Sequence, residues 1–121
     1  DPNANTAVSS GIRGVWAGGG TPATSPSTSN IIEYVTITTE GNSTDFGDLT
    51  AVRRNLAGCT NRIRGTFAGG HIGASGTGDN LNTIDFITIA STGNAQDFGD
   101  LTVIRRCSNS GGSDAHGGLV R

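Results

Sequence analysis

The stretch "NIIEYVTITTEGNSTDFGDLTAVRR" (Asn30–Arg54) returns about 52 residues later as "NTIDFITIASTGNAQDFGDLTVIRR" (Asn82–Arg106). A second segment, "GVWAGGG" (Gly14–Gly20), is repeated in the same way as "GTFAGG" (Gly65–Gly70). A period of this size indicates that one structural unit is written twice along the chain. A third copy begins with "DAHGGLV" (Asp114–Val120), and the chain ends before its Gly-Gly turn.

The repeat sets the domain organisation that we expect. We predict one domain, residues 1–121, made of a first unit (7–57), a second unit (58–109) and a partial third (110–121). The two full units differ in length only in the Ser/Thr/Pro/Gly-rich connection that follows the glycine segment. A surface loop between two fixed strands tolerates such a change.

Composition and patterning predict an all-β fold. Of the 121 residues, 33% are hydrophobic and 15% charged, and Gly, Ser, Thr and Asn dominate. Apolar residues do not recur at helical spacing over any long stretch, so short strands and turns are favoured. A chain of this length buries only about two thirds of its unfolded surface, so its core is small.

The strands of each unit lack a clean polar face. "IIEYVTI" (Ile31–Ile37) is apolar on both sides, which is typical of a strand covered on both sides. Phe46 and Phe98 are the single large anchors of the later "DFGDLT" strands. We expect four short antiparallel strands in each unit, as in a propeller blade, and two blades cannot close a ring. The units therefore need partners, which are either further units of a longer protein or copies of the same chain, and we expect completion by self-association.

A Gly-Gly doublet ending a strand, a variable loop, Asn before an apolar strand, an aromatic residue and a final Arg resemble the kelch repeat of β-propellers. "NTIDFITIASTGNAQDFGDLTVIRR", together with "AGC" and "HGGL", is also similar to repeats of tail-fibre and appendage proteins of marine bacteriophages. Phe46 and Phe98 stand where kelch repeats usually carry Trp. The resemblance implies a scaffold whose function lies in its loops.

The charged residues are repeated with the unit. A calcium or sugar site is one interpretation, and an ion pair or turn cap that holds each unit to the next is the other. Repetition in every unit favours the structural interpretation, and calcium would need some six to eight oxygen ligands. The candidate inter-repeat residues are Arg13, Arg64, Asp45, Asp48, Arg53, Arg54, Asp97, Asp100, Arg105 and Arg106, with Phe46 and Phe98 as apolar anchors.

A few single residues are candidates for other roles. His71 lies in a variable loop and is a candidate ligand contact, although no acid or nucleophile accompanies it. Trp16 and Tyr34 align with Phe67 and Phe86, which favours core packing over a sugar-stacking platform. Cys59 and Cys107 form a disulfide only if the fold brings their Cα atoms within about 7 Å, and two small buried or half-buried thiols are the favoured alternative.

Several classes of protein are disfavoured. The net charge of -2 and the absence of a basic stripe argue against nucleic acid as a partner. No apolar run is long enough to cross a bilayer. No nucleophile elbow, His-rich metal motif or phosphate loop is present, so we expect no enzyme, no catalytic or metal site and no cofactor.

Self-assembly is the main functional expectation, because strands with open faces and edges must find partners. Three chains could close a six-bladed ring, or residues 110–121 could donate a strand to the next copy and propagate a filament. We expect a structural or adhesive module of a phage tail fibre or another extracellular appendage, located outside cells or on a virion. The alternative is a lectin-like propeller that binds surface glycans through the loops Thr21–Ser29 and His71–Leu81.

Overall fold

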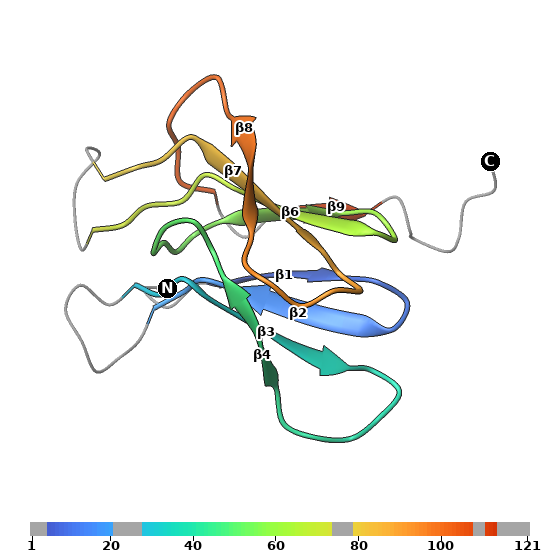
Figure 1. The fold of residues 1–121 in the computed structure, drawn as a ribbon. Helices are drawn as coiled ribbons and strands as arrows, with labels where there is room; N and C mark the ends of the chain where they lie inside the picture. The colour runs from blue at the N-terminus through green and yellow to red at the C-terminus, as the bar shows by residue number, and fades with distance from the viewer. Residues whose placement is uncertain (1–4, 21–27, 74–78, 108–110, 114–121) are drawn as a thin grey trace, which may run out of the picture.

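The computed structural model describes residues 5–20, 28–73, 79–107 and 111–113. Every regular element within these ranges is a β-strand, which confirms the all-β prediction (Figure 1). The strands are β1 (Thr6–Ser9), β2 (Arg13–Ala17), β3 (Ile31–Thr36), β4 (Thr44–Asp48), β5 (Ala57–Thr60), β6 (Arg64–Ala68), β7 (Thr83–Thr88), β8 (Gln96–Asp100) and β9 (Gly111–Ser113).

The strands form two sheets, one for each unit. The first sheet has the order β1-β2-β3-β4, and the second has the order β8-β7-β6-β5-β9. Successive strands within β1–β4 and within β5–β8 are antiparallel, as predicted for two four-stranded units. The short strand β9 belongs to the partial third unit, and it extends the second sheet by pairing with β5 in parallel.

The repeated glycine doublet has a structural reason. Gly18 and Gly69 end β2 and β6 with a φ of 66°, a conformation that glycine adopts without a Cβ penalty. A Cβ at Gly18 would lie 2.5 Å from the carbonyl oxygen of Arg53. The next glycine in each copy donates its N–H at 3.0 Å to the carbonyl of Arg53 or Arg105. The doublet therefore lets the chain after the fourth strand approach the end of the second.

The two sheets pack face to face, with β1 lying against β5 and β6 (Figure 1). In β2 the buried side chains are Val15 and Ala17, whereas β6 buries Gly65 and Phe67. Because Phe67 aligns with the exposed Trp16, the two units bury opposite faces of the same strand. We call the face of each unit that corresponds to Val15 in β2 its front, and the opposite face, which corresponds to Phe67 in β6, its back. The front of the first unit thus packs against the back of the second.

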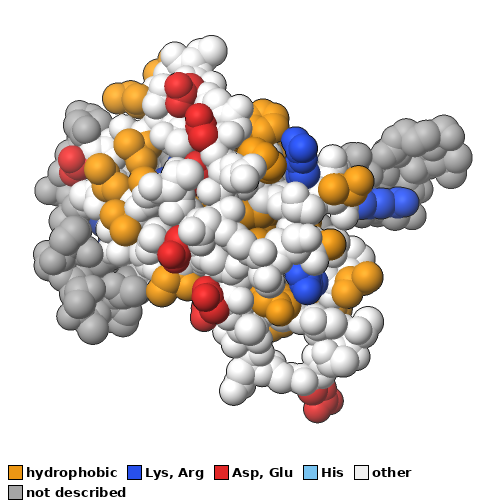
Figure 2. All heavy atoms as spheres, in the orientation of Figure 1, with side chains coloured by type: hydrophobic (Ala, Val, Ile, Leu, Met, Phe, Trp, Pro, Cys, Tyr) orange, Lys and Arg blue, Asp and Glu red, His pale blue; other side chains and the backbone are white. Residues whose placement is uncertain are grey.

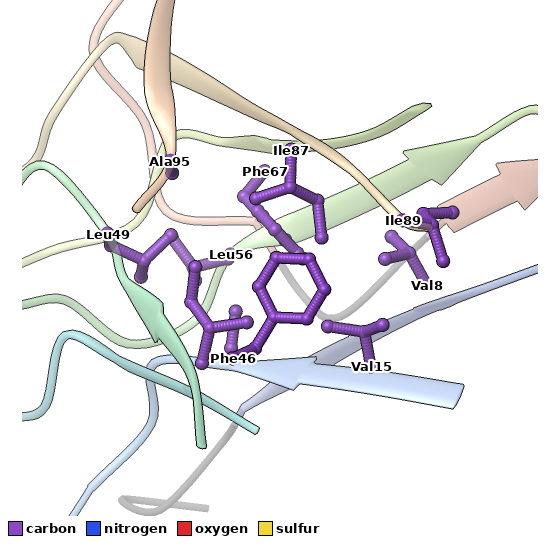
Figure 3. Close-up of a cluster of buried hydrophobic side chains, with 11 residues drawn as sticks. Val8, Val15, Phe46, Leu49, Leu56, Phe67, Ile87, Ile89 and Ala95 are labelled. Carbon is purple, nitrogen blue, oxygen red and sulfur yellow. The ribbon is translucent and has the colours of Figure 1, made fainter. Parts of the chain in front are cut away.

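The hydrophobic core lies between the sheets, and both units contribute to it (Figure 3). Phe46 and Leu49 come from the β4 region, and Ile87 and Ile89 come from β7 and the turn after it. Neither sheet has a separate core in the described part of the chain. The buried apolar residues are Val8, Val15, Ala17, Ile32, Phe46, Leu49, Leu56, Phe67, Ile87, Ile89 and Ala95.

Apolar side chains remain at the surface of the protein, and several are visible on the side shown in Figure 2. Phe46 is 3% exposed, whereas its counterpart Phe98 is 56% exposed. Ile89 is 1% exposed, and its counterpart Ile37 is 57% exposed. The expectation of core packing for Trp16 is also wrong within this chain, because Trp16 lies on the face that points away from the second sheet. No helix among the described residues is long and apolar enough to span a membrane.

Candidate functional site: the seam between the two units

We call the surface on which β1–β4 pack against β5–β8 the seam. At its centre Arg53 of the first unit forms an ion pair with Asp85 of the second, with 2.7 Å between Nη2 and Oδ2. Neither side chain is exposed to solvent. Arg53 lies in the segment after β4, and Asp85 lies on β7. The pair therefore joins the end of one unit to the middle of the next.

The remaining polar atoms of the ion pair are largely satisfied. Nη1 of Arg53 donates to the carbonyls of Gly69 (3.0 Å) and Thr83 (2.8 Å), and Nη2 also donates to the carbonyl of Phe67 (3.3 Å). Within the ion pair, Nε of Arg53 is the one side-chain atom that is buried without a partner among the described residues. Burial lowers the pKa of Arg53 below its ordinary value, and the charge of Asp85 opposes this shift. Arginine nevertheless stays protonated in proteins, so the pair is ionic.

Thr50 completes the coordination of Asp85. Its N–H donates to Oδ2 at 3.0 Å and its hydroxyl donates to Oδ1 at 2.7 Å. A carboxylate held by a guanidinium and two further donors is well compensated for the loss of water. Thr50 and Arg53 both come from the segment after β4, so this segment holds Asp85 from two directions.

Main-chain contacts form a second part of the seam. Gly93 and Ala95, in the turn between β7 and β8, donate their N–H groups to the carbonyls of Phe46 (2.7 Å) and Asp48 (2.8 Å). The side-chain oxygen of Asn94 accepts the N–H of Asp48 at 3.0 Å. Gly47 has a φ of 147°, and a Cβ there would overlap the carbonyl of Gly93. Because Gly47 has no side chain, the turn at Gly93 of the second unit can pack directly against it.

Arg13 forms a third part of the seam. Its guanidinium stacks 4.5 Å from the ring centroid of Tyr34 and donates from Nη1 to the carbonyl of Ile89 at 2.9 Å. Arg64, the counterpart in the second unit, stacks in the same way on Phe86 at 4.8 Å. Arg64 is exposed. The cation–π stack thus forms within each unit, whereas the hydrogen bond from Arg13 to Ile89 forms between the two units.

The four repeated aspartates Asp45, Asp48, Asp97 and Asp100 are exposed, and none of them forms an ion pair with another described residue. Asp97 accepts the N–H of Gly99 at 3.2 Å in a local turn contact. The ion pair that the repeat predicted therefore lies on Asp85 and not on these residues. The sequence does carry a signal for Asp85: Glu33 is acidic at the aligned position, within a strand that is otherwise apolar.

A register shift, as a β-bulge makes, accompanies this acidic position in both units. It lies between Ile32 and Glu33 in the first sheet and between Ile84 and Asp85 in the second. Bulges re-aim side chains and recur at functional positions. The residue left without a partner by the shift is Phe46 on β4 and Phe98 on β8, so the duplicated bulge is a feature of the repeat.

His71 and Arg54 form a separate buried contact beside the seam. Nε of Arg54 donates to Nε2 of His71 at 3.1 Å, and the two residues exchange main-chain hydrogen bonds of 3.1 and 3.0 Å. Nδ1 of His71 is buried without a partner among the described residues. His71 was a candidate ligand residue, but it is 3% exposed and fixes the segment of Arg54. Arg106, the counterpart of Arg54, is exposed and donates from Nε to Oδ1 of Asn80 at 3.1 Å.

The environment of His71 leads to a prediction on pH. Burial lowers its pKa from 6.5, and the nearby guanidinium groups of Arg106 and Arg54 lower it further. Since the unfolded chain takes up a proton near pH 6.5 and the folded chain does so only at lower pH, the folded state loses stability as pH falls below about 6.5. Urea unfolding between pH 5 and 8 should show this slope.

His71→Gln is the matched variant for this measurement, because it keeps an acceptor and cannot become a cation. The difference between wild type and variant cancels the contribution of His116, which lies outside the described residues. An identical pH slope in both proteins would contradict the assignment.

The cysteines are both free thiols, Cys59 exposed and Cys107 half-buried, so the candidate disulfide is absent from this structure. The described residues contain no group of three or more His, Cys, Asp or Glu side chains arranged to hold a metal ion. The loop segments 21–27 and 74–78 of the expected glycan-binding surface, and most of the expected donor segment 110–121, lie outside the described residues. The seam is therefore the candidate site that the described residues define.

No protein-family model matches the chain, and no curated protein sequence matches it.

Proposed function

We propose that the chain is a non-enzymatic structural or adhesive repeat module that works by assembling with further copies of its repeat. The observation that carries this proposal is that the hydrophobic core lies between two units whose opposite faces meet. A contact between unlike faces is heterologous. It leaves the back of the first unit and the front of the second unit open, and further copies can bind there. The exposed apolar residues on both outer faces support this interpretation.

The setting of this module comes from the sequence resemblance. The repeat is similar to those of phage tail fibres and virion appendages, and it resembles kelch propeller blades. We accordingly propose a place in a tail fibre or another extracellular appendage. A scaffold of stacked sheets gives mechanical continuity and displays its loops away from the contact surfaces.

The mass in solution tests self-assembly. Sedimentation velocity of the full chain over a hundredfold range of concentration should show species heavier than one chain, with the heavier fraction increasing with concentration. A compact monomer over the whole range would contradict the proposed function.

A glycan array tests the alternative, a lectin-like module. Loop-dependent binding, lost when residues 21–27 and 74–78 are exchanged for Gly/Ser linkers of equal length, would favour the lectin. Retained assembly without glycan binding would favour the structural role.

A further inference from the structure

We propose that a second copy of this chain docks its first unit onto the outer face of the second unit, and that Arg105 and Glu33 form the ion pair of this new seam. The inference rests on the proposed self-assembly and specifies its contact. It follows from the internal seam, because the ion pair, the glycine turn and the apolar residues that meet there have counterparts exposed on the outer faces.

Both residues of the buried ion pair, Arg53 and Asp85, have an aligned residue on an outer face. Arg105 aligns with Arg53, and its exposed guanidinium makes no hydrogen bond or ion pair with the described residues. Glu33 aligns with Asp85 and is exposed, and within the described part of the chain the hydroxyl of Ser43 donates to it at 3.3 Å. Thr102 aligns with Thr50 and is also exposed. A guanidinium on one outer face and a carboxylate on the other are therefore complementary between copies.

The main-chain contact can also be repeated. Gly41 has a φ of 156° and Gly93 a φ of 155°, and Asn42 follows the first as Asn94 follows the second. The receiving glycine, Gly99, has a φ of 144°, close to that of Gly47. A Cβ at Gly99 or at Gly41 would meet nothing within 4 Å in this chain. The space beside Gly99 is thus of the kind that the Gly93 turn occupies beside Gly47.

The apolar contacts follow the same rule. Phe98 is exposed on the outer face of the second unit, where its counterpart Phe46 is buried by the seam. Ile37 and Trp16 are exposed on the outer face of the first unit, where Ile89 and Phe67 are buried. Docking front to back would bury all three. Arg64 would then reach the carbonyl of Ile37 as Arg13 reaches that of Ile89.

Two charge-reversal variants test the contact on the full chain. In Arg105→Glu, the new carboxylate of one copy would face Glu33 of the next copy. In Glu33→Arg, the new guanidinium would face Arg105 of the neighbouring copy. Each variant alone should associate on the order of a hundredfold more weakly than wild type in sedimentation equilibrium. An equimolar mixture should recover association, because each face of one variant is then complementary to a face of the other.

The controls separate this contact from other effects. Arg62→Glu makes the same change of charge as Arg105→Glu, at an exposed position in the turn between β5 and β6, and should associate as wild type does. Gly99→Ala should weaken association by placing a methyl group against the incoming turn. Circular dichroism verifies that each variant keeps its sheets.

The outcomes are distinct. Assembly of wild type with unchanged assembly of both charge variants, or failure of the mixture to recover, would overturn this contact and leave the proposed function standing. A wild-type chain that stays monomeric would overturn both.

Discussion

Asp85→Ala is expected to lower the free energy of unfolding by about 3–5 kcal/mol, because it leaves the guanidinium of Arg53 buried without its counter-charge. Arg53 and Asp85 are both fully buried, and Thr50 would lose its acceptor at the same time. A small domain has only about 5–15 kcal/mol in total, so the variant should be close to unfolding at 37 °C. Urea denaturation followed by circular dichroism measures the difference.

The repeat supplies the control for this variant. Glu33→Ala removes the aligned carboxylate, which is exposed in a single chain, and should change stability by no more than about 0.5 kcal/mol. The double variant Arg53→Ala/Asp85→Ala should cost less than the sum of the two single variants, since it removes the unpaired charge. Equal costs for Asp85→Ala and Glu33→Ala would show that the buried pair has no special role.

Phe46→Ala is expected to cost about 3–5 kcal/mol, the range for a large aromatic side chain removed from a core. Phe46 is buried in the seam and forms an edge-to-face contact with Tyr34 at 5.8 Å between ring centroids. Phe98 makes a similar contact with Phe86 at 5.9 Å, yet more than half of it is exposed. Thermal and urea unfolding of Phe46→Ala should therefore show a large loss of stability.

Phe98→Ala is the matched control, because it removes the same side chain from the same "DFGDLT" motif. It should cost about 1 kcal/mol or less when measured at concentrations where the chain is monomeric. At concentrations where copies associate, its cost should rise, because docking would bury Phe98. Similar losses for Phe46→Ala and Phe98→Ala in the monomer would contradict the position of the core.

The candidate site was only partly predictable. The repeated Arg pairs indicated a structural ion pair between units, and Arg53 does form one. Its partner was assigned to the aspartates near "DFGD", because these recur at a fixed distance from the Arg pair. The contact of Asp85 with Arg53 is not predictable from the repeat, because it depends on the stacking of the two sheets. The sequence places His71 in a variable loop, and no pattern in it pairs His71 with Arg54.

The sequence alone determined the repeat, its strands and the glycine turns between them. These properties are local, because the hydrophobic period, the turn residues and the duplicated segment can be recognised directly in the amino-acid sequence. Only the tertiary structure decided which member of each duplicated pair is buried: Phe46 and not Phe98, Asp85 and not Glu33, Arg53 and not Arg105. The reason is physical, because nearly identical segments have the same local preferences, and their difference arises only from which face has a neighbour.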